Sequence, residues 1–411
     1  MKLLQFGAGN IGRSFIGQLF SAAGYEVVFV DVDARIISAL NEKRGYTVAI
    51  RDRKNYDIAV RNVHAISALD ANAVCREMED ADICGTAVGP NALPKLFPVI
   101  AKAVAHRYDK GRGAIDFILC ENLRDAGRIV LEGLRSFLPS GFPLETYVGL
   151  AETSIGKMVP LVAESQRNRD PLTVYAEAYN TLILDKNALL NGVPNVPGLS
   201  PQDNMKAYVD RKSFIHNLGH AALAYYSFMV APEKICTYEA VEDATIRSWV
   251  RNAMEEAGAW LIRAYPHEFN PANITGHIED LLNRFGNRSL GDTIHRVGRD
   301  LTRKLSAEDR VAGALRACHA SGLQCPWIKT ALACGLFFLP PDGDNKVFAP
   351  DEIVVRQAAA DGPEAFLRSV SGLDETLLDQ VAAIYRHIQN HLRTGAILKK
   401  EALAAIAAKR Q

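Results

Sequence analysis

Residues 2–33 read KLLQFGAGNIGRSFIGQLFSAAGYEVVFVDVD. The apolar run from Lys2 to Phe6 predicts a short strand, and a glycine-rich turn follows it at residues 7–12. Apolar side chains at helical spacing predict a helix over residues 11–23, and residues 26–32 predict a second buried strand. A strand, a crossover helix and a second strand in this order form a unit with two parallel strands.

The turn has the pattern GxGxxG and consists of Gly7, Ala8, Gly9, Asn10, Ile11 and Gly12. In this pattern the first glycine permits a tight turn, the second lets the backbone approach a pyrophosphate, and the third lets helix and strand pack closely. The phosphates then lie at the positive N-terminal end of the helix. Because the turn joins a strand to a helix, we infer that it binds a dinucleotide together with Phe6; a purely structural turn is the alternative.

Asp31 ends the second predicted strand. This is the position of the carboxylate that binds a ribose hydroxyl in dinucleotide-binding domains. Asp31 and the nearby Asp33 would repel the 2′-phosphate of NADP, and no arginine follows immediately to accept it. The sequence therefore predicts NAD as the cofactor.

Two later loops are expected at the same edge of the sheet. Ala87 and Val88 come at the end of a predicted strand at residues 81–87, and Asn122 follows another at residues 114–119. Ligands of open α/β sheets lie in the crevice past the carboxyl ends of the strands. We expect all three residues to contact the cofactor, Asn122 on the nicotinamide side; ordinary loop residues would fit the same pattern.

The alternation of strands and helices predicts an α/β fold, with an N-terminal Rossmann-type doubly wound, mostly parallel sheet and a mostly helical C-terminal domain. Residues 191–201 hold three prolines and two glycines, too many for a helix or an internal strand. We place the domain boundary there. Further strands are expected at residues 46–50, 147–150 and 172–184, and the domains at residues 1–195 (NAD-binding) and 196–411 (helical, substrate-binding and catalytic).

The composition limits the partners of the chain. Its 47 basic and 47 acidic side chains cancel, so no overall field directs it to nucleic acid or to an anionic membrane, and a small-molecule substrate is expected. Seven cysteines without CxxC spacing predict reduced thiols, and no motif predicts a metal site. A strand directly after Met1 and the lack of a long apolar run predict a cytoplasmic protein without signal peptide or membrane span.

Residues 211–220 concentrate groups that could oxidise an alcohol. At about 100° per residue, Lys212, Asn217 and His220 fall within roughly 140° of a helix. A desolvated lysine can serve as the base, an asparagine can bind the reacting oxygen, and a histidine can orient either group. A solvated lysine with two buried histidines fits the same spacing, and His216 is as well placed as His220.

The spacing Lys212-x4-Asn217-x2-His220 behind a GxGxxG domain resembles the polyol-specific long-chain dehydrogenases, the mannitol dehydrogenase family, and within it the branch that acts on mannitol 1-phosphate. The resemblance implies a lysine base, an asparagine on the reacting oxygen, no zinc, and His220 in place of His216. One departure is Leu301 after Asp300, where a proline is expected. The matching stretches are residues 6–13, 86–91, 195–198, 214–220 and 295–300.

Arg296, Arg299 and Arg303 recur at i, i+3 and i+7 and would share one face of a continuous helix. Guanidinium groups bind phosphate oxygens in pairs, so these arginines are the expected phosphate site, although charge runs are often only solvated faces. With the resemblance, we expect NAD-dependent interconversion of mannitol 1-phosphate and fructose 6-phosphate. The alternatives are a dehydrogenase of unphosphorylated polyols or sugar acids, of the mannitol 2-dehydrogenase or fructuronate reductase type, and a non-catalytic NAD-sensing module.

Overall fold

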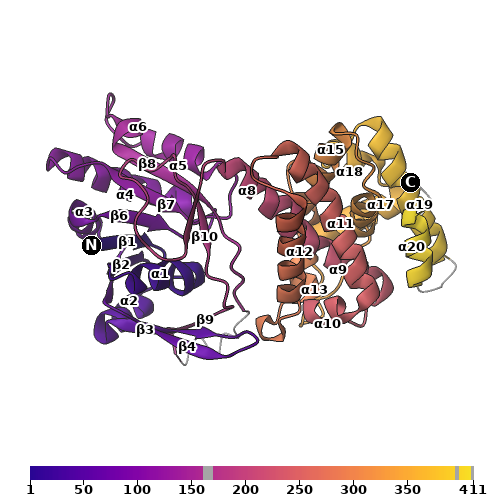
Figure 1. Cartoon of the computed structure of the whole chain (residues 1–411), viewed down its shortest axis with the longest axis horizontal. Helices are drawn as coiled ribbons and strands as arrows, with labels where there is room; N and C mark the ends of the chain where they lie inside the picture. The colour runs from indigo at the N-terminus through magenta and orange to yellow at the C-terminus, as the bar shows by residue number, and fades with distance from the viewer. Residues whose placement is uncertain (161–169, 394–397, 409–411) are drawn as a thin grey trace. The chain divides into compact units, whose positions relative to one another are not determined.

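The computed structural model describes residues 1–160, 170–393 and 398–408. The chain divides into two compact units, Met1–Val209 and Asp210–Gln411. The first combines sheet and helices, and the second is built from helices (Figure 1). The α/β fold class predicted from the sequence is confirmed. No helix in the described ranges is both long enough and apolar enough to cross a membrane.

The first unit contains an eight-stranded sheet. Six neighbouring strands of it, in the spatial order β8-β7-β6-β1-β2-β5, are parallel. At the far edge β10 runs antiparallel to β8, and β11 runs parallel to β10. In spatial order the strands are β11 (Leu199–Gln202), β10 (Leu182–Asp185), β8 (Val148–Ser154), β7 (Ile115–Leu119), β6 (Ile83–Thr86), β1 (Lys2–Phe6), β2 (Glu26–Asp31) and β5 (Val63–Ser67).

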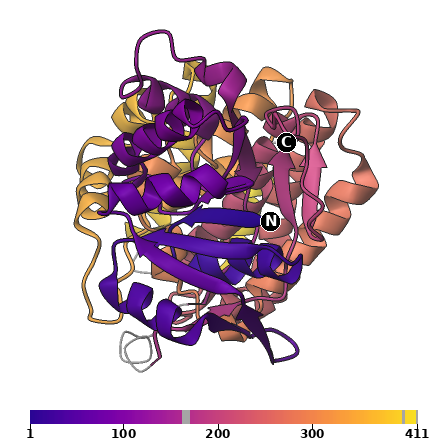
Figure 2. The ribbon, with the colours of Figure 1, turned by 90° about the vertical axis from the view of Figure 1, so that its left-hand side faces the viewer.

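Successive side chains of β1 enter two different cores, because neighbouring residues of a strand point to opposite faces of the sheet. Leu4 and Phe6 pack in one core, and Leu3 packs in the other. Both faces are therefore buried, as in parallel sheets covered by helices. Figure 2 looks onto this unit, with the N-terminal strand near the middle of the picture.

The helices of the first unit divide between these two cores. The first core takes side chains from α3 (Ala71–Asp80), α4 (Leu93–Asp109), α5 (Ala126–Arg135) and α6 (Leu144–Tyr147). The second takes side chains from the π-helical turn η1 (Gly12–Gly17), α1 (Gln18–Ala22) and α2 (Ala34–Lys43).

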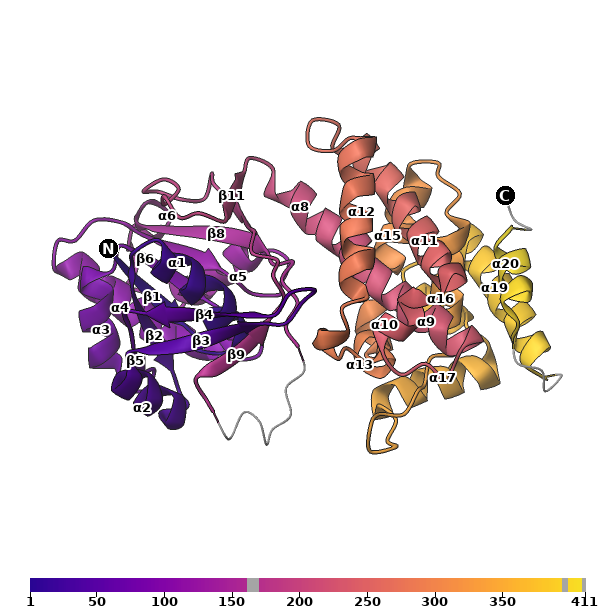
Figure 3. The same ribbon diagram turned by 60° about the horizontal axis from the view of Figure 1, so that its bottom comes forward.

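A second, three-stranded sheet has the order β4-β3-β9, with bounds Tyr56–Arg61, Gly45–Ile50 and Thr173–Ala176 (Figure 3). The strand predicted at residues 46–50 exists but lies in this sheet and not in the large one. The strand predicted over residues 172–184 divides into β9 and β10, which belong to different sheets. β4 and β5 were not expected, since β4 is mostly exposed and lacks the apolar run of a buried strand.

The division between the units comes after Val209, later in the chain than the boundary predicted after Asn195. The later position has a physical cause. β11 pairs with β10 from Leu199 to Gln202, so the chain is still part of the large sheet after the proline-rich stretch. Pro201 lacks an N–H group and is tolerated because β11 is an edge strand.

Helix α9 (Leu218–Val230) forms the centre of the second unit and packs against α11, α13 and α16. Nearly all of its side chains are buried, which explains why it is apolar all round. The other elements are α8 (Met205–Arg211, across the division), η2 (Lys212–Asn217), α10 (Thr237–Glu242), α11 (Ala244–Ala264), α12 (Pro271–Phe285), η3 (Arg288–Leu290), α13 (Ile294–Gly298), α14 (Leu301–Lys304), α15 (Ala312–Ala320), α16 (Pro326–Gly335), α17 (Ala349–Asp361), α18 (Glu364–Ser369), α19 (Glu375–Arg393) and α20 (Lys400–Ala408).

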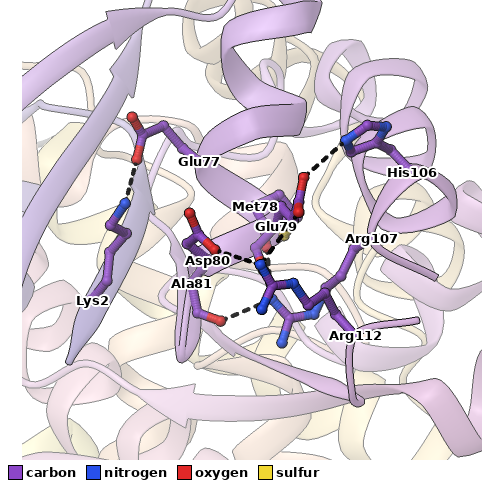
Figure 4. A network of polar contacts seen from close by, with 9 residues as sticks. All are labelled: Lys2, Glu77, Met78, Glu79, Asp80, Ala81, His106, Arg107 and Arg112. Carbon is purple, nitrogen blue, oxygen red and sulfur yellow. Dashed lines mark hydrogen bonds and ion pairs between the residues drawn. The ribbon is translucent and has the colours of Figure 1, made fainter. Parts of the chain in front are cut away.

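A buried arginine closes the C-terminal end of α3 in the first unit (Figure 4). Arg107 Nη1 donates to the carbonyl oxygens of Met78 (2.7 Å), Glu79 (3.0 Å) and Ala81 (2.9 Å), and its Nε donates to Gly113 O (2.9 Å). The last carbonyls of a helix lack partners within the helix, and a positive charge is favourable there. Arg107 therefore ties α3 and β6 to α4.

Replacing Arg107 with methionine is expected to lower the free energy of unfolding of the first unit by about 3 kcal/mol, because buried carbonyls lose a charged donor. Hydrogen exchange of the α3 amides in the full chain measures this change. Arg112→Met is the matched control, since Arg112 is exposed and pairs with Glu79 and Asp80 at the surface, and it should cost below about 1 kcal/mol. Equal losses in both variants would contradict the role of Arg107.

Candidate active site

The glycine turn lies where the order of the strands reverses, between β1 and β6. Gly7 has a φ of +96°, and a Cβ atom on it would come within 2.5 Å of Ala87 O. A Cβ atom on Gly12 would overlap Gly7 O, whereas one on Gly9 would meet nothing within 4 Å. The three glycines thus provide a tight turn, an open approach and a close packing contact, in the order that the pattern requires.

Arg13 lies directly behind the turn and was not singled out in the sequence. It is buried, and its Nε donates to Ala8 O (2.6 Å) while its Nη1 donates to Pro171 O (2.6 Å). Tyr46 Oη donates to the backbone oxygen of Arg13 (2.7 Å). Burial lowers the pKa of the guanidinium, which nevertheless stays charged at neutral pH. A fixed positive charge therefore supports the turn from inside the fold.

Asp31 holds the other side of the turn. Its Oδ2 accepts the N–H of Ala8 (2.7 Å), and its Oδ1 accepts the N–H groups of Val32 (2.7 Å) and Asp33 (3.0 Å). The side chain is partly exposed, so Oδ2 retains a lone pair for a ligand hydroxyl. The open backbone at Gly9 and this carboxylate fit the pyrophosphate and the ribose of a dinucleotide.

The loop after β6 is anchored by Glu121, a residue that the sequence analysis did not single out. Its buried carboxylate accepts the N–H groups of Val88 (3.0 Å) and Gly89 (2.8 Å). Burial raises the pKa of Glu121 above its usual value. The predicted contact residues Ala87 and Val88 thus lie beside the glycine turn, and the exposed Asn122 follows β7 at the same edge of the sheet.

In the second unit, Lys212 begins the π-helical turn η2. The N–H of Leu218 bonds to Ser213 O, five residues earlier, where an α-helix would use the residue four earlier. Residues five apart lie nearly above one another in such a turn. The angle between Lys212 and Asn217 around the helix axis is therefore smaller than the roughly 140° expected for an α-helix. The α-helical geometry assumed for this segment was wrong because the sequence carries no mark of the wider turn.

The exposure pattern of η2 and the start of α9 separates two groups of residues. Lys212, Asn217 and His220 are partly exposed, whereas residues 213–216 are buried. His216 is 6% exposed, and His220 stacks on Phe285 with ring centroids 3.9 Å apart. The accessible face therefore carries the three residues that were predicted as catalytic.

Burial shifts the pKa values of all three titratable groups in this segment. The pKa of Lys212 falls to about 8 because the ammonium is desolvated and the charge of Arg310 is near. Burial lowers the pKa values of His216 and His220 well below the usual value, so both imidazoles are neutral at pH 7. A lysine with this pKa can exchange a proton near neutral pH without a metal.

The three arginines predicted as a phosphate site do not lie on one continuous helix. Asp300 has a φ of +74° and separates α13 from α14. Arg296 pairs with the buried Asp292, Arg303 Nε lies 2.6 Å from Asp300 Oδ2, and the Arg299 guanidinium lies 5.5 Å from the Phe348 ring centre. The condition of a shared helical face is therefore not met.

Leu301 stands where the family resemblance predicts a proline, and its backbone N–H makes a hydrogen bond. Its N–H donates to Asp351 Oδ1 (2.7 Å), and the N–H of Asp300 donates to Asp351 Oδ2 (2.8 Å). A proline at position 301 could not make the first bond. Asp351 thus stabilises the break between α13 and α14.

The described parts of the chain contain no group of three or more His, Cys, Asp or Glu side chains arranged to hold a metal ion.

Two family descriptions match the sequence. Residues 1–198 match the mannitol dehydrogenase Rossmann domain, and residues 204–393 match the mannitol dehydrogenase C-terminal domain. Two solved structures illustrate the shared fold. A D-sorbitol dehydrogenase, solved in substrate-free form, is 17% identical with a TM-score of 0.78, and the match covers 98% of this chain and 94% of that one.

The mannitol 2-dehydrogenase of Pseudomonas fluorescens, solved as a ternary complex with NAD and D-mannitol, is 15% identical with a TM-score of 0.73. The match covers 100% of this chain and 94% of that chain. At such low identities the structural likeness shows only the fold. The two family matches show the family, because together they span most of the sequence. The chain belongs to the mannitol dehydrogenase family of oxidoreductases.

Proposed function

We propose that this protein interconverts D-mannitol 1-phosphate and D-fructose 6-phosphate with NAD, by hydride transfer at C5 and without a metal. The observation that carries the proposal is the accessible face of Lys212, Asn217 and His220, on which the lysine has a pKa of about 8 and the neighbouring charges are basic. The first unit holds the cofactor, and the second supplies the base and the substrate-binding groups.

The first unit supports NAD. Gly9 leaves the backbone open to a pyrophosphate, and the negative charge of Asp31 suits the two ribose hydroxyls of NAD better than the 2′-phosphate of NADP. When bound, NAD accepts the hydride. The solved Pseudomonas fluorescens relative holds the same cofactor.

Lys212 acts as the base in the oxidation direction. At pH 7 a lysine with a pKa of about 8 is neutral in roughly one molecule in ten, so it can take the proton of the C5 hydroxyl as the hydride leaves. Asn217 donates a hydrogen bond to the reacting oxygen, whose negative charge grows in the transition state. The neutral imidazole of His220 orients the same hydroxyl or the lysine.

The charges near His220 support a phosphorylated substrate. Four of them act on this histidine and all are basic: Arg310, Arg296, Arg284 and Lys304. Partly buried cations that repel one another are stabilised by a bound anion, and guanidinium groups suit phosphate. We therefore propose a phosphate site in this region of the second unit. Arg296, Arg299 and Arg303 are the residues expected there from the sequence, although they do not share one helical face.

An unphosphorylated polyol is the alternative substrate, and two observations favour it. The solved relatives carry the names of a sorbitol and a mannitol dehydrogenase. Arg296 and Arg303 also have carboxylate partners in their own unit, which reduces the charge available to a phosphate.

A non-catalytic NAD sensor would not need the accessible Lys212, Asn217 and His220, so these residues disfavour that reading.

The substrate assay separates these readings. With saturating NAD, kcat/KM for mannitol 1-phosphate is expected to exceed that for mannitol by about 100-fold, the contribution of roughly two charge-assisted hydrogen bonds to a phosphate. The rate of NADH formation measures both values. A preference for mannitol would remove the phosphorylated substrate, and no turnover on either compound or on a wider polyol panel would revive the sensor.

Lys212→Ala is expected to lower kcat at pH 7 by about 10²- to 10⁴-fold, because the reaction loses its base. Binding of NAD, followed by calorimetry, should be nearly unchanged. In the wild type the rate of polyol oxidation should rise about tenfold per pH unit up to pH 8 and then level off, because only the neutral lysine accepts a proton. Ketose reduction should show the opposite limb, since it requires the protonated lysine. A fully active variant would exclude Lys212 from the mechanism.

Asp31→Asn tests the choice of cofactor. The asparagine retains an acceptor for the N–H of Ala8 but removes the charge, so the ratio of kcat/KM for NADP to that for NAD should rise by about tenfold. Asp33→Asn is the control, because Asp33 is already paired with Arg35 at 3.0 Å and should change the ratio much less. Equal ratios in the wild type and Asp31→Asn would contradict the assignment.

A further inference from the structure

Arg310 differs from the other arginines near the candidate active site, and the sequence pattern did not single it out. It is 9% exposed, and its Nε donates to Asp309 Oδ1 at 2.7 Å. Within the described residues neither terminal amino group of Arg310 makes a hydrogen bond. Neither terminal amino group is among the fully buried polar atoms without a partner, so both reach accessible surface and can donate to a ligand oxygen.

The segment that carries Arg310 packs against η2. Gly313 lies so close to Phe214 that an added Cβ atom would be 3.2 Å from the ring. The charge of Arg310 acts on both Lys212 and His220, and on each of them it has the largest effect of any neighbouring charge. Arg310 therefore lies near the predicted base and near His220.

The neighbouring arginines are already engaged. Arg296 pairs with Asp292, Arg284 lies 3.3 Å from Asp280, and Arg303 bridges Asp300 (2.6 Å) and Asp309 (3.5 Å). Arg303 also shares Asp309 with Arg310, which fixes the carboxylate that orients the Arg310 Nε. Of Arg284, Arg296, Arg303 and Arg310, Arg310 is the one that is buried, and its two terminal amino groups make no hydrogen bond within the described residues.

We propose that Arg310 binds the anionic end of the substrate and determines the preference for it, with Asp309 as its positioning residue. This inference rests on the proposed function, because it takes the substrate anion to be the phosphate of a hexitol phosphate. It replaces the three arginines chosen from the sequence with one buried guanidinium whose two terminal amino groups match two phosphate oxygens. Arg296, Arg299 and Arg303 then shape the surroundings.

The test uses the full-length enzyme with saturating NAD and three variants. Arg310→Met removes the charge, and Arg310→Lys retains it but loses the planar fork. Arg316→Met is the matched control, since Arg316 belongs to α15, is partly exposed and contacts Ala307 O and Glu308. The measurements are kcat/KM for mannitol 1-phosphate and for mannitol, the inhibition constant of inorganic phosphate against the polyol, and the thermal midpoint with NAD.

Arg310→Met is expected to lower the ratio of kcat/KM for mannitol 1-phosphate to that for mannitol by about 100-fold, and to weaken phosphate inhibition by a similar factor. Arg310→Lys should lower the ratio by about tenfold, and it replaces the methionine variant if that variant does not fold. Arg316→Met should leave both quantities within about threefold of the wild type.

The outcomes separate this inference from the proposed function. A wild type that prefers mannitol 1-phosphate, together with folded Arg310 variants that keep the same ratio, overturns the role of Arg310 and leaves the function standing. If the wild type prefers mannitol but is inhibited competitively by phosphate, and Arg310→Met loses this inhibition, the proposed function is refuted and the anion site at Arg310 is retained. Phosphate inhibition that is equal in the wild type and both Arg310 variants overturns the site.

Discussion

The contact between Gly7 and the carbonyl oxygen of Ala87 fixes the cofactor edge of the first unit. β1 and β6 are neighbours where the strand order reverses, and the N–H of Ala87 donates to Phe6 O at 2.8 Å. The backbone of Gly7 then passes so near to Ala87 O that no side chain fits. Arg13 holds Ala8 O from inside the fold, and Asp31 holds the N–H of Ala8 from the other side. The turn is therefore held by contacts on both of its sides.

In the second unit the corresponding constraint is electrostatic. Burial makes the charged form of Lys212 unfavourable, and the positive charge of Arg310 adds to that effect. The same arrangement that produces a usable base also produces a region in which an anion is favourable. Base strength and substrate charge are thus linked, because an anion bound at Arg310 would partly cancel the charge that lowers the pKa of Lys212. A neutral polyol would leave that charge in place.

Local spacing was sufficient to predict the glycine turn, the strand that ends at Asp31 and the α/β fold class, because the patterns behind them are continuous in the sequence. It was insufficient for Arg13, Glu121 and Arg310, whose importance comes from backbone atoms and charges that only the folded chain brings near. Edge strands were missed for a related reason. β4 is mostly exposed and β11 contains Pro201, so neither has the apolar pattern of a buried strand. The continuous helix expected for Arg296, Arg299 and Arg303 is interrupted at Asp300. This residue adopts a left-handed backbone conformation, although the helical spacing of the arginines continues past it in the sequence.

Each unit contains a π-helical turn, η1 in the first and η2 in the second, and wide turns of this kind are frequent at functional sites. A π turn leaves backbone groups that an α-helix would pair, so contacts from elsewhere must stabilise it. In η1, Tyr46 Oη donates a hydrogen bond to the backbone carbonyl oxygen of Arg13. In η2, Phe214 packs on Trp260 with ring centroids 5.4 Å apart, and residues 213–216 are buried. The wider turn at η2 brings Asn217 into register with Lys212, which an α-helix would place on a different side. The tertiary packing of the second unit, and not helix propensity, is therefore what sets Lys212 and Asn217 on one face.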